Sequence, residues 1–520
     1  MADQRAVHRQ QDRQRCRQQQ SHDQPRAPAG PQKCIPSHPA FAHSGLVARQ
    51  GRGANPRGGL PTALSDPRNR PVSAPSPSPA DADTAQVAII GAGLAGLALG
   101  IRLQAAGMDT LILEQQEDAG GCVGSLRRDS FVFELGPCTV PDLAPLEELW
   151  RLGGADLAAD CEFLPLPPLV RFDWPDGRRL DLTGDTEGDR AAVAAFAPAD
   201  LPAYETWRSG GRGWRLRPRF RNTRFRDALT SMGLLTDAAP ARAQQIAALT
   251  GGWAVRGGTD RLIAALVRHY ERLGGRLLLR HTVTALSRDP AGTCQIACSN
   301  GFSMKAASVV SSLGADNTRA LLSTPRNSRR QLAPAIFTVH FALRGSWPGI
   351  GHHGLLMCDE HHASVRAVRD KGILPARSSI VLSHPSAVDP ALAPVGHAVF
   401  RASTIVPNLR QAPLNWAAVG PQLERAILAE TGQRLIPDLA DRLVMAFHTT
   451  PADWANRLAL PGGTPFGLRE PARAAARGLP DNVVLIGAQA GAGAAIPDVL
   501  AGAERAASRL LGQLRSAGKG

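Results

Sequence analysis

Three glycines, Gly91, Gly93 and Gly96, have the G-x-G-x-x-G spacing of a loop that binds the pyrophosphate of a dinucleotide. In such a loop the first glycine permits a tight turn, the second lets the pyrophosphate approach the backbone, and the third lets a helix pack closely on a strand. Glu114 follows about twenty residues later, where a carboxylate can bind a ribose hydroxyl. These four residues predict a dinucleotide site, with an ordinary glycine-rich turn as the alternative.

The cysteines and histidines show no pattern of a disulfide framework or a metal site. The eight cysteines contain no C-x-x-C pair and no metal spacing with histidine, so scattered reduced thiols are the simplest interpretation. The pairs His352–His353 and His361–His362 are poor candidates for chelation because adjacent residues of a strand point to opposite faces. We therefore expect no metal site.

The elements around the glycine loop have the form of a mononucleotide-binding unit. Val87 to Ile90 are continuously apolar, as in a strand that is buried on both faces of a parallel sheet. The helix expected after the loop offers unpaired N–H groups and its positive dipole end to a phosphate. A second strand, Thr110 to Leu113, then places Glu114 at its carboxyl end. This order of elements favours dinucleotide binding over the ordinary turn.

Later parts of the chain repeat this organisation. A helix is expected after Gly257–Gly258, with Thr259 as its N-cap and Gly274 as its stop. The chain closes with a strand, a glycine–alanine turn and a helix. The expected strands lie at 276–280, 283–287, 308–311 and 482–486, and the closing helix at about 497–514. A first and a last unit of the same form indicate a dinucleotide domain that is interrupted by a second domain.

Length and charge limit the protein class. A chain of 520 residues has room for two or three domains. Much of the net charge of +14 lies in residues 1–80, which hold twelve lysines and arginines against four aspartates. Basicity is nearly all arginine, which indicates a GC-rich genome more than nucleic-acid binding, and no nucleic-acid partner is expected. No stretch approaches the roughly 20 apolar residues that span a bilayer.

Residues 1–85 show no apolar periodicity and are expected to be disordered. An idle tail, or translation from a start codon upstream of the true one, is the favoured interpretation. A transit peptide and a basic tether are the alternatives.

From residue 86 to about 515 the chain resembles the bacterial phytoene-desaturase family of FAD-dependent carotenoid desaturases, within the amine-oxidase-like flavoproteins. The resemblance rests on the glycine unit with FELGPCTVPD after it, and on three later segments, GGWAVRGGTDRLIAALVRHYERLGGRLLLRHTVTAL, PAIFTVHFALRGSWPGIGHHGLLM and NVVLIGAQAGAGAAIPDVLAGAERAA. The segment FDWPDGRRLDLTGD is similar to the branch that introduces 3,4 double bonds into hydroxylated carotenoids.

The resemblance implies an α/β fold, namely a doubly wound, Rossmann-like FAD-binding domain of the GR2 type with an inserted α+β substrate domain. The implied division is a disordered extension over 1–85, FAD-binding segments over 86–180, 257–330 and 471–520, a shortened helical and membrane-facing region over 181–256, and a substrate sheet over 331–470.

The resemblance also implies the residues that hold FAD. They comprise two glycine loops, the ribose acid, a strand residue that meets the adenine through its backbone, and a closing motif at the flavin end. These residues are Gly91, Gly93, Gly96, Glu114, Gly120, Gly121, Val283, Gly487, Ala488, Gly493, Ile496 and Pro497. Cys122 departs from the family's pattern, which has an arginine at this position near the pyrophosphate.

The implied reaction is the desaturation of an acyclic carotenoid, with hydride transfer to FAD and with quinone or oxygen as candidate electron acceptors. The reacting carbons carry no acidic proton, so the protein mainly orients the substrate and excludes water. Asp227, beside Arg226, corresponds to the family's suspected acid–base aspartate. The alternative for Asp227 is a solvated helix residue paired with a nearby arginine.

A carotenoid resides in the bilayer, so the enzyme must reach it. Residues 207–226 combine eight arginines with aromatic residues, which suits an anionic membrane surface, or alternatively forms a solvated loop. A cytoplasmic protein associated peripherally with the membrane is expected. The competing functions are a flavoprotein or carotenoid isomerase with another apolar substrate, and a non-enzymatic lipid-binding module, since fold alone does not fix function.

Overall fold

The computed structural model describes residues 84–167, 170–209, 220–231, 251–325, 331–469, 472–491 and 493–517. Within these ranges most strands belong to two seven-stranded sheets, and two antiparallel two-stranded sheets stand apart from them. The two pairs are β3 (Ser125–Arg128) with β4 (Phe131–Glu134), and β5 (Phe163–Leu166) with β8 (Gly252–Val255).

The first sheet contains the predicted dinucleotide unit. Its strands lie in the order β10-β11-β12-β1-β2-β9, and β18 also pairs with β12. Their bounds are β1 Thr84–Ile90, β2 Thr110–Leu113, β9 Arg276–Leu278, β10 Val283–Arg288, β11 Cys294–Cys298, β12 Ser303–Ser311 and β18 Val483–Leu485. β1 is parallel to both of its neighbours, β12 and β2. Every residue of β2 is buried, as expected at the centre of a parallel sheet.

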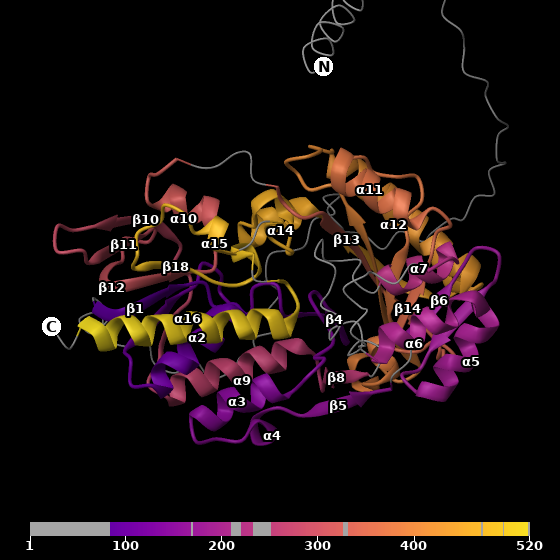
Figure 1. Ribbon diagram of the computed structural model, residues 1–520, viewed down its shortest axis with the longest axis horizontal. Helices are drawn as coiled ribbons and strands as arrows, with labels where there is room; N and C mark the ends of the chain where they lie inside the picture. Colours follow the sequence, from indigo (N-terminus) through magenta and orange to yellow (C-terminus); the bar gives the residue numbers. More distant parts are fainter. Residues whose placement is uncertain are drawn as a thin grey trace, which may run out of the picture. The chain divides into compact units, whose positions relative to one another are not determined.

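Three helices pack together against this sheet. α2 (Leu94–Ala105) follows β1, and both α9 (Thr259–Arg272) and α16 (Ile496–Ala517) contact it. Figure 1 shows the three helices beside one another, although they come from distant parts of the sequence. Their apolar residues form one core with β1 and β2. The first and the last units of the chain therefore meet around α2, as the sequence predicts.

The second sheet has the order β17-β13-β16-β15-β14-β6-β7. Its strands are antiparallel neighbours except for β14 and β6, which are parallel. The bounds are β6 Val170–Asp173, β7 Arg179–Leu182, β13 Ala335–Arg344, β14 His353–Leu356, β15 Ile380–Ser383, β16 His397–Val406 and β17 Leu443–Thr449. The predicted α/β class with a second, mixed domain is confirmed by this arrangement.

The two faces of the second sheet pack against different elements. One face forms a core with α12 (Trp416–Arg434) through residues such as Phe337 and Ile427. The other face meets the β3–β4 hairpin at one end and, at the other end, the helices α5 (Thr186–Phe196), α6 (Leu201–Ser209) and α7 (Thr223–Ser231). The remaining helices are α3 Ala144–Leu152, α4 Leu157–Asp160, α10 Ala315–Leu321, α11 His361–Lys371, α13 Leu439–Arg442, α14 Pro451–Leu458 and α15 Ala472–Ala475.

Three sequence expectations about boundaries need correction. β1 already begins at Thr84, so the predicted extension over 1–85 overlaps a buried strand that pairs with β12. Residues 170–182 form β6 and β7 of the second sheet, because β6 pairs with β14, and so 170–180 does not join the first sheet. The predicted N-cap Thr259 is the first helical residue instead, and Gly258, with φ +106°, precedes it.

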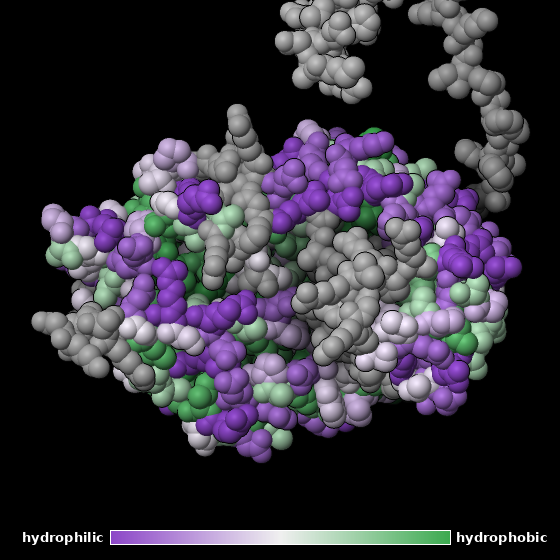
Figure 2. Space-filling model, viewed as in Figure 1, coloured by the Kyte–Doolittle hydropathy of each residue, from purple (hydrophilic) through white to green (hydrophobic). Residues whose placement is uncertain are grey.

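Solvent-facing helices carry their polar residues outward. In α11 the exposed positions include His362, Arg366 and Asp370, while His361 and Val368 are buried at helical spacing. Figure 2 shows a hydrophilic surface in this region of the molecule. None of the helices in the described ranges combines the length and apolar character that crossing a bilayer requires.

Candidate cofactor and substrate site

The first glycine loop is shaped by backbone contacts that only glycine allows. Gly91 has φ +102° directly after β1, and its N–H donates to the Leu113 carbonyl at 2.8 Å. A β-carbon on Gly96 would overlap the carbonyl oxygen of Gly91. Helix α2 therefore starts against the turn only because residue 96 is glycine, which is the role predicted for the third glycine of the motif.

The second glycine pair lies directly against the first loop. Gly120 forms a parallel bridge with Gly93, and its N–H donates to the Ala92 carbonyl at 2.9 Å. A β-carbon on Gly93 would sit 3.8 Å from the Gly120 carbonyl oxygen and 4.0 Å from the Cα of Gly121. The backbones of Gly93 and Gly120 therefore lie side by side at the N-terminus of α2, with no side chain between them. This cradle fits a dinucleotide pyrophosphate, which needs close backbone approach and a helix N-terminus.

The predicted ribose acid, Glu114, is buried beside the same loop. Its carboxylate accepts hydrogen bonds from the N–H groups of Ala92 at 2.8 Å and of Gln116 at 2.9 Å. The N–H of His281 donates to the Glu114 carbonyl at 2.7 Å, which places Val283, at the start of β10, two residues further along. A carboxylate has acceptor sites beyond these two bonds, so Glu114 can still receive ribose hydroxyls.

The closing motif meets the N-terminal turn of α2. Gly487 has φ +78°, and a β-carbon there would lie 3.3 Å from the Cβ of Ala95. Ala488 follows Gly487 in the short turn, and Ile496 with Pro497 opens α16. Gly493, with φ +100°, lies between them. The structure therefore brings the two glycine loops, Glu114 and Gly487 together, and Val283 lies two residues beyond the contact of His281 with Glu114.

Cys122, where the resemblance implies an arginine, is a partly buried thiol. Burial raises its pKa to about 12, and the charge of Arg457 opposes this shift. Arg457 is the last basic residue of α14, and its carbonyl accepts a hydrogen bond from Gln116 at 2.6 Å. The positive charge of Arg457, which comes from a distant part of the sequence, therefore acts on Cys122 next to the second glycine loop. Sequence reasoning missed it because residues 122 and 457 meet only in the folded chain.

Asp227 lies beside a different hydrophobic core from the glycine loops. Its helix, α7, contributes Phe225 and Ala228 to the core at the β6–β7 end of the second sheet, whereas the glycine loops belong to the first core. The Asp227 carboxylate contacts Arg226 at 3.3 Å and His362 Nδ1 at 3.7 Å. Burial raises the pKa of Asp227, while Arg226 and His362 oppose the rise. The structure does not bring Asp227 into the glycine cradle.

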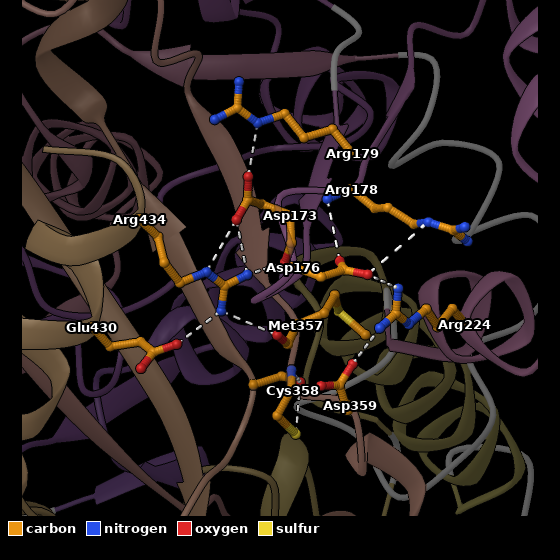
Figure 3. A network of polar contacts seen from close by, with 11 residues as sticks. Asp173, Asp176, Arg178, Arg179, Arg224, Met357, Cys358, Asp359, Glu430 and Arg434 are labelled. Carbon is orange, nitrogen blue, oxygen red and sulfur yellow. Dashed lines mark hydrogen bonds and ion pairs between the residues drawn. The ribbon is translucent and has the colours of Figure 1, made fainter.

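A polar network fixes α7 to the sheet edge. Arg224 of α7 donates to Asp176, in the β6–β7 turn, and to Asp359, before α11, at 2.7 Å each. Figure 3 shows this pair of contacts beside a second, buried cluster in which Arg434 and Asp173 meet. The position of Asp227 thus depends on charged contacts that the sequence alone does not reveal.

The aromatic part of the predicted membrane segment is partly buried. Trp207 and Phe225 have only 7% and 0% of their surface exposed and pack in the core with Tyr204. Their burial follows from α6 and α7 lying on the second sheet, so these two rings are not interfacial anchors in this structure. Positions 210–219 and 232–250 of the predicted helical region lie outside the described residues.

The histidine pairs do not have the expected geometry. His352 precedes β14, so its ring does not alternate with His353, and the two ring centroids are 4.5 Å apart. His361 is buried against Ser379 Oγ at 3.0 Å, while His362 faces Asp227. Across the described parts of the chain, no group of three or more His, Cys, Asp or Glu side chains is arranged to hold a metal ion.

Glu134 is a buried carboxyl group that sequence reasoning missed. It lies at the end of β4 and accepts hydrogen bonds from the Thr259 N–H at 3.0 Å and from Ser125 Oγ at 3.0 Å. The Thr259 hydroxyl also donates to it, which explains why that side chain does not cap its own helix. Burial raises the pKa of Glu134 to about 7, although these donors oppose the shift.

This raised pKa predicts a pH dependence of stability. An unfolded glutamate titrates near pH 4.5, so between that pH and about 7 the folded protein retains a proton that the unfolded chain releases. The contribution of protonated Glu134 is full below pH 4.5 and is lost as the pH rises through 7. We expect the free energy of unfolding to fall by up to roughly 3 kcal/mol across this range through this group.

Glu134→Gln should remove that part of the slope, as urea unfolding at pH 5, 6, 7 and 8 would measure. The buried histidines have lowered pKa values and therefore lose stability in the opposite direction, on acidification. The same histidines are present in the parent and in Glu134→Gln. The difference between their free energies of unfolding at each pH therefore reports the contribution of Glu134 alone. Parallel pH profiles for the two proteins would contradict the raised pKa.

Two known family models match separate parts of the chain. Residues 89–153 match the family model described as an NAD(P)-binding Rossmann-like domain. Residues 234–347 match the model described as flavin containing amine oxidoreductase. The chain therefore has a Rossmann-like domain of the kind that binds flavin or nicotinamide dinucleotides.

Individual proteins are similar over most of the chain. A lycopene-forming phytoene desaturase of Paracoccus sp. is 30% identical over 489 residues, which cover 82% of this chain and 98% of that protein. A neurosporene-forming phytoene desaturase of Cereibacter sphaeroides is 28% identical, covering 83% and 95%. Among solved structures, an oxidoreductase from Methanosarcina mazei has a TM-score of 0.57 at 17% identity, covering 81% and 99%, which supports the fold.

Proposed function

Because the chain belongs to the phytoene desaturase family of FAD-dependent oxidoreductases, we propose that it introduces double bonds into an acyclic carotenoid. The observation that carries this proposal is the backbone cradle formed by Gly93 and Gly120 beside Glu114, in a chain similar to a desaturase along nearly all of that protein's length. The cofactor we assign to the cradle is FAD.

FAD, when bound, supplies the hydride acceptor for the removal of two hydrogens from adjacent carbons. The two glycine loops bind the pyrophosphate, and Glu114 orients the adenosine by accepting its ribose hydroxyls. The turn at Gly487, packed on Ala95, supports the flavin end of the cofactor. Because the cradle consists of glycine backbone at the N-terminus of α2 rather than of flexible side chains, it holds the cofactor without further ordering.

The second hydrogen leaves as a proton, and we assign Asp227 to accept or hold it. Burial raises the pKa of Asp227, which makes its carboxyl group better suited to hold a proton than an exposed aspartate. His362 and Arg226 lie beside the carboxylate and stabilise its ionised form. Because the two hydrogens leave adjacent carbons, the proposal requires the flavin end of the cofactor to reach toward α7, so that FAD and Asp227 meet the same bond. The electron acceptor that reoxidises FAD is proposed to be quinone or oxygen.

Expression in a host that accumulates an acyclic carotenoid tests the function. The protein should extend the conjugated system, which shifts the pigment absorbance to longer wavelength. Asp227→Asn should lower the rate by about 100-fold or more while leaving FAD bound, as expected for loss of an acid–base group. The measurements are pigment absorbance and the flavin spectrum of the purified protein.

Arg226→Gln is the matched variant, because it removes the neighbouring charge and keeps the carboxylate. A parental rate in Asp227→Asn would remove Asp227 from the mechanism. Unchanged pigments with every acyclic carotenoid, despite bound FAD, would favour a flavoprotein acting on another apolar substrate. A colourless protein would instead favour the lipid-binding alternative.

Access to a carotenoid requires contact with a membrane surface, and we retain peripheral association as part of the proposal. The net positive charge of residues 207–226 supports it, although Arg208 and Arg224 are already paired with aspartates. Trp207 and Phe225 do not contribute, since both are buried.

A further inference from the structure

The part of the chain that forms the two glycine loops carries little positive charge of its own. From residue 84 to 127 it has two basic residues, Arg102 and Arg127, and each is paired with a carboxylate at 2.9 Å. Residues 114–118 hold three acids. A pyrophosphate carries full negative charges, whereas a helix N-terminus offers only a partial positive charge. The cradle therefore lacks a full counter-charge from its own segments.

Arg457 is a cation that the fold brings to these segments. It lies near the C-terminal end of α14, and its carbonyl accepts hydrogen bonds from the side-chain amides of Gln116 at 2.6 Å and of Gln115 at 3.3 Å. Two residues later, the Ala459 carbonyl accepts a bond from Asn317 Nδ2 at 2.8 Å. Three amide side chains therefore hold the end of α14 beside the segments that follow β2 and β12.

The same contacts link the backbone of Arg457 to the ribose acid. The Gln116 N–H donates to one carboxylate oxygen of Glu114 at 2.9 Å, and the other oxygen accepts from Ala92 in the first loop at 2.8 Å. A continuous path of hydrogen bonds thus runs from the first glycine loop through Glu114 and Gln116 to Arg457. The position of Arg457 is therefore fixed by residues of the candidate cofactor site.

The guanidinium of Arg457 is exposed and has no partner within the described part of the chain. Among those residues it forms no ion pair and no hydrogen bond, and only the carbonyl of Arg457 is engaged by other side chains. Its charge nevertheless acts on Cys122, where it opposes the rise in the pKa of the thiol. An unpaired cation thus lies near two loops of glycine backbone, where it can bind an anion.

Glu114 limits which anion of a dinucleotide this arginine can bind. A phosphate on the ribose 2′ oxygen would meet the Glu114 carboxylate, so two like charges would lie together. The pyrophosphate is the anion that remains. A guanidinium suits phosphate oxygens because its N–H groups form a fork, and such charge-assisted bonds are roughly twice as strong as neutral ones.

We propose that Arg457 binds the pyrophosphate of FAD and supplies the positive charge that the two glycine loops lack. This inference rests on the proposed function, which assigns FAD to the cradle. The glycine backbone allows the close approach of the phosphates, and Arg457 neutralises part of their charge. A side chain of α14, more than 300 positions after the loops, thus completes the cofactor site.

The test measures the dissociation constant of FAD for the full chain, through the change in flavin fluorescence on binding. Arg457→Gln removes the charge and keeps the backbone carbonyl that Gln116 bonds, so the fold should not change. The dissociation constant should rise about tenfold or more, as expected for the loss of one hydrogen bond to a charged group. Arg457→Lys keeps the charge without the fork and should lose less than Arg457→Gln.

Arg280→Gln is the matched control, because it makes the same change in net charge beside the same segment. Arg280 is exposed, and its guanidinium is already paired with Glu117 at 2.9 Å. The dissociation constant of this variant should equal that of the parent. Added salt should weaken FAD binding more in the parent than in Arg457→Gln, because salt screens the ion pair that the variant lacks.

ADP and adenosine separate a bond to the pyrophosphate from a contact with the adenine. ADP carries the pyrophosphate, so it should compete with FAD for the parent and bind Arg457→Gln about tenfold more weakly. Adenosine carries no phosphate, and its own dissociation constant should be the same for the two proteins.

Equal dissociation constants of FAD for the parent and Arg457→Gln would overturn the assignment and make Arg457 a solvated surface residue. An equal loss in Arg280→Gln would overturn it as well, because the effect would then come from net charge alone. Weakened binding of adenosine, as large as that of ADP, would place the arginine on the adenine instead. None of these measurements depends on turnover, so pigment absorbance decides the proposed function separately.

Discussion

Gly93→Val should fold like the parent and lose its FAD. A β-carbon at this position meets the second loop only at ordinary contact distances, 3.8 Å from Gly120 O, and Gly93 has an extended backbone with φ −74°. The protein itself therefore tolerates the side chain. The same side chain fills the space between the two loops, so a pyrophosphate can no longer approach the backbone. We expect the affinity for FAD to fall at least about 100-fold.

Two other glycines separate this effect from a general loss of structure. Gly96→Val should fail to fold, because its β-carbon would overlap the Gly91 carbonyl at the junction of α2 and β1. Gly124→Ala should behave like the parent, since a β-carbon there meets no atom within 4 Å. Circular dichroism reports folding, and titration of apoprotein with FAD reports affinity. Full flavin absorbance in Gly93→Val would show that this loop does not bind the pyrophosphate.

The dinucleotide unit could be predicted closely because its signals are local. An apolar run, three glycines at fixed spacing and a terminal acid specify β1, the turn, α2 and β2; β2 has the predicted bounds, and β1 begins three residues before the predicted run. The acid then needs only the adjacent strand to reach the loop, and Glu114 does bond to Ala92. The same locality explains why the closing strand, turn and helix were also predicted.

The rest of the site depends on contacts between distant segments, which a sequence pattern does not supply. Gln116 bonds the Arg457 carbonyl across 341 positions of chain, and β6 joins a strand more than 180 residues later. The error at Thr259 has the same origin. Its hydroxyl fits the local pattern of an N-cap, but in the folded chain it donates a hydrogen bond to Glu134, 125 residues away, instead. Trp207 and Phe225 likewise fit a surface segment in the sequence. They are buried because α6 and α7 pack on the second sheet.

Arg434→Met should remove about 3–5 kcal/mol from the free energy of unfolding, because it leaves a buried carboxylate with too few partners. Arg434 Nε and Nη2 lie 3.0 and 2.9 Å from Asp173 Oδ1, and its Nη1 donates to the Met357 carbonyl at 3.1 Å. The side chains of Arg434 and Asp173 are only 8% and 5% exposed. After the change Asp173 keeps the half-exposed Arg179 at 2.8 Å, which compensates only in part.

The same network offers a control of nearly equal geometry. Arg224 bridges Asp176 and Asp359 at 2.7 Å each, but these carboxylates are 45% and 55% exposed, so Arg224→Met should cost less than about 1 kcal/mol. Asp173→Asn with Arg434→Met should cost less than the sum of the single changes, since no unpaired buried charge remains. Urea unfolding followed by circular dichroism measures the parent and the four variants, namely Arg434→Met, Arg224→Met, Asp173→Asn and the double change. Equal losses for Arg434→Met and Arg224→Met would mean that burial does not govern the strength of this network, and that water reaches Asp173 when its partner is removed.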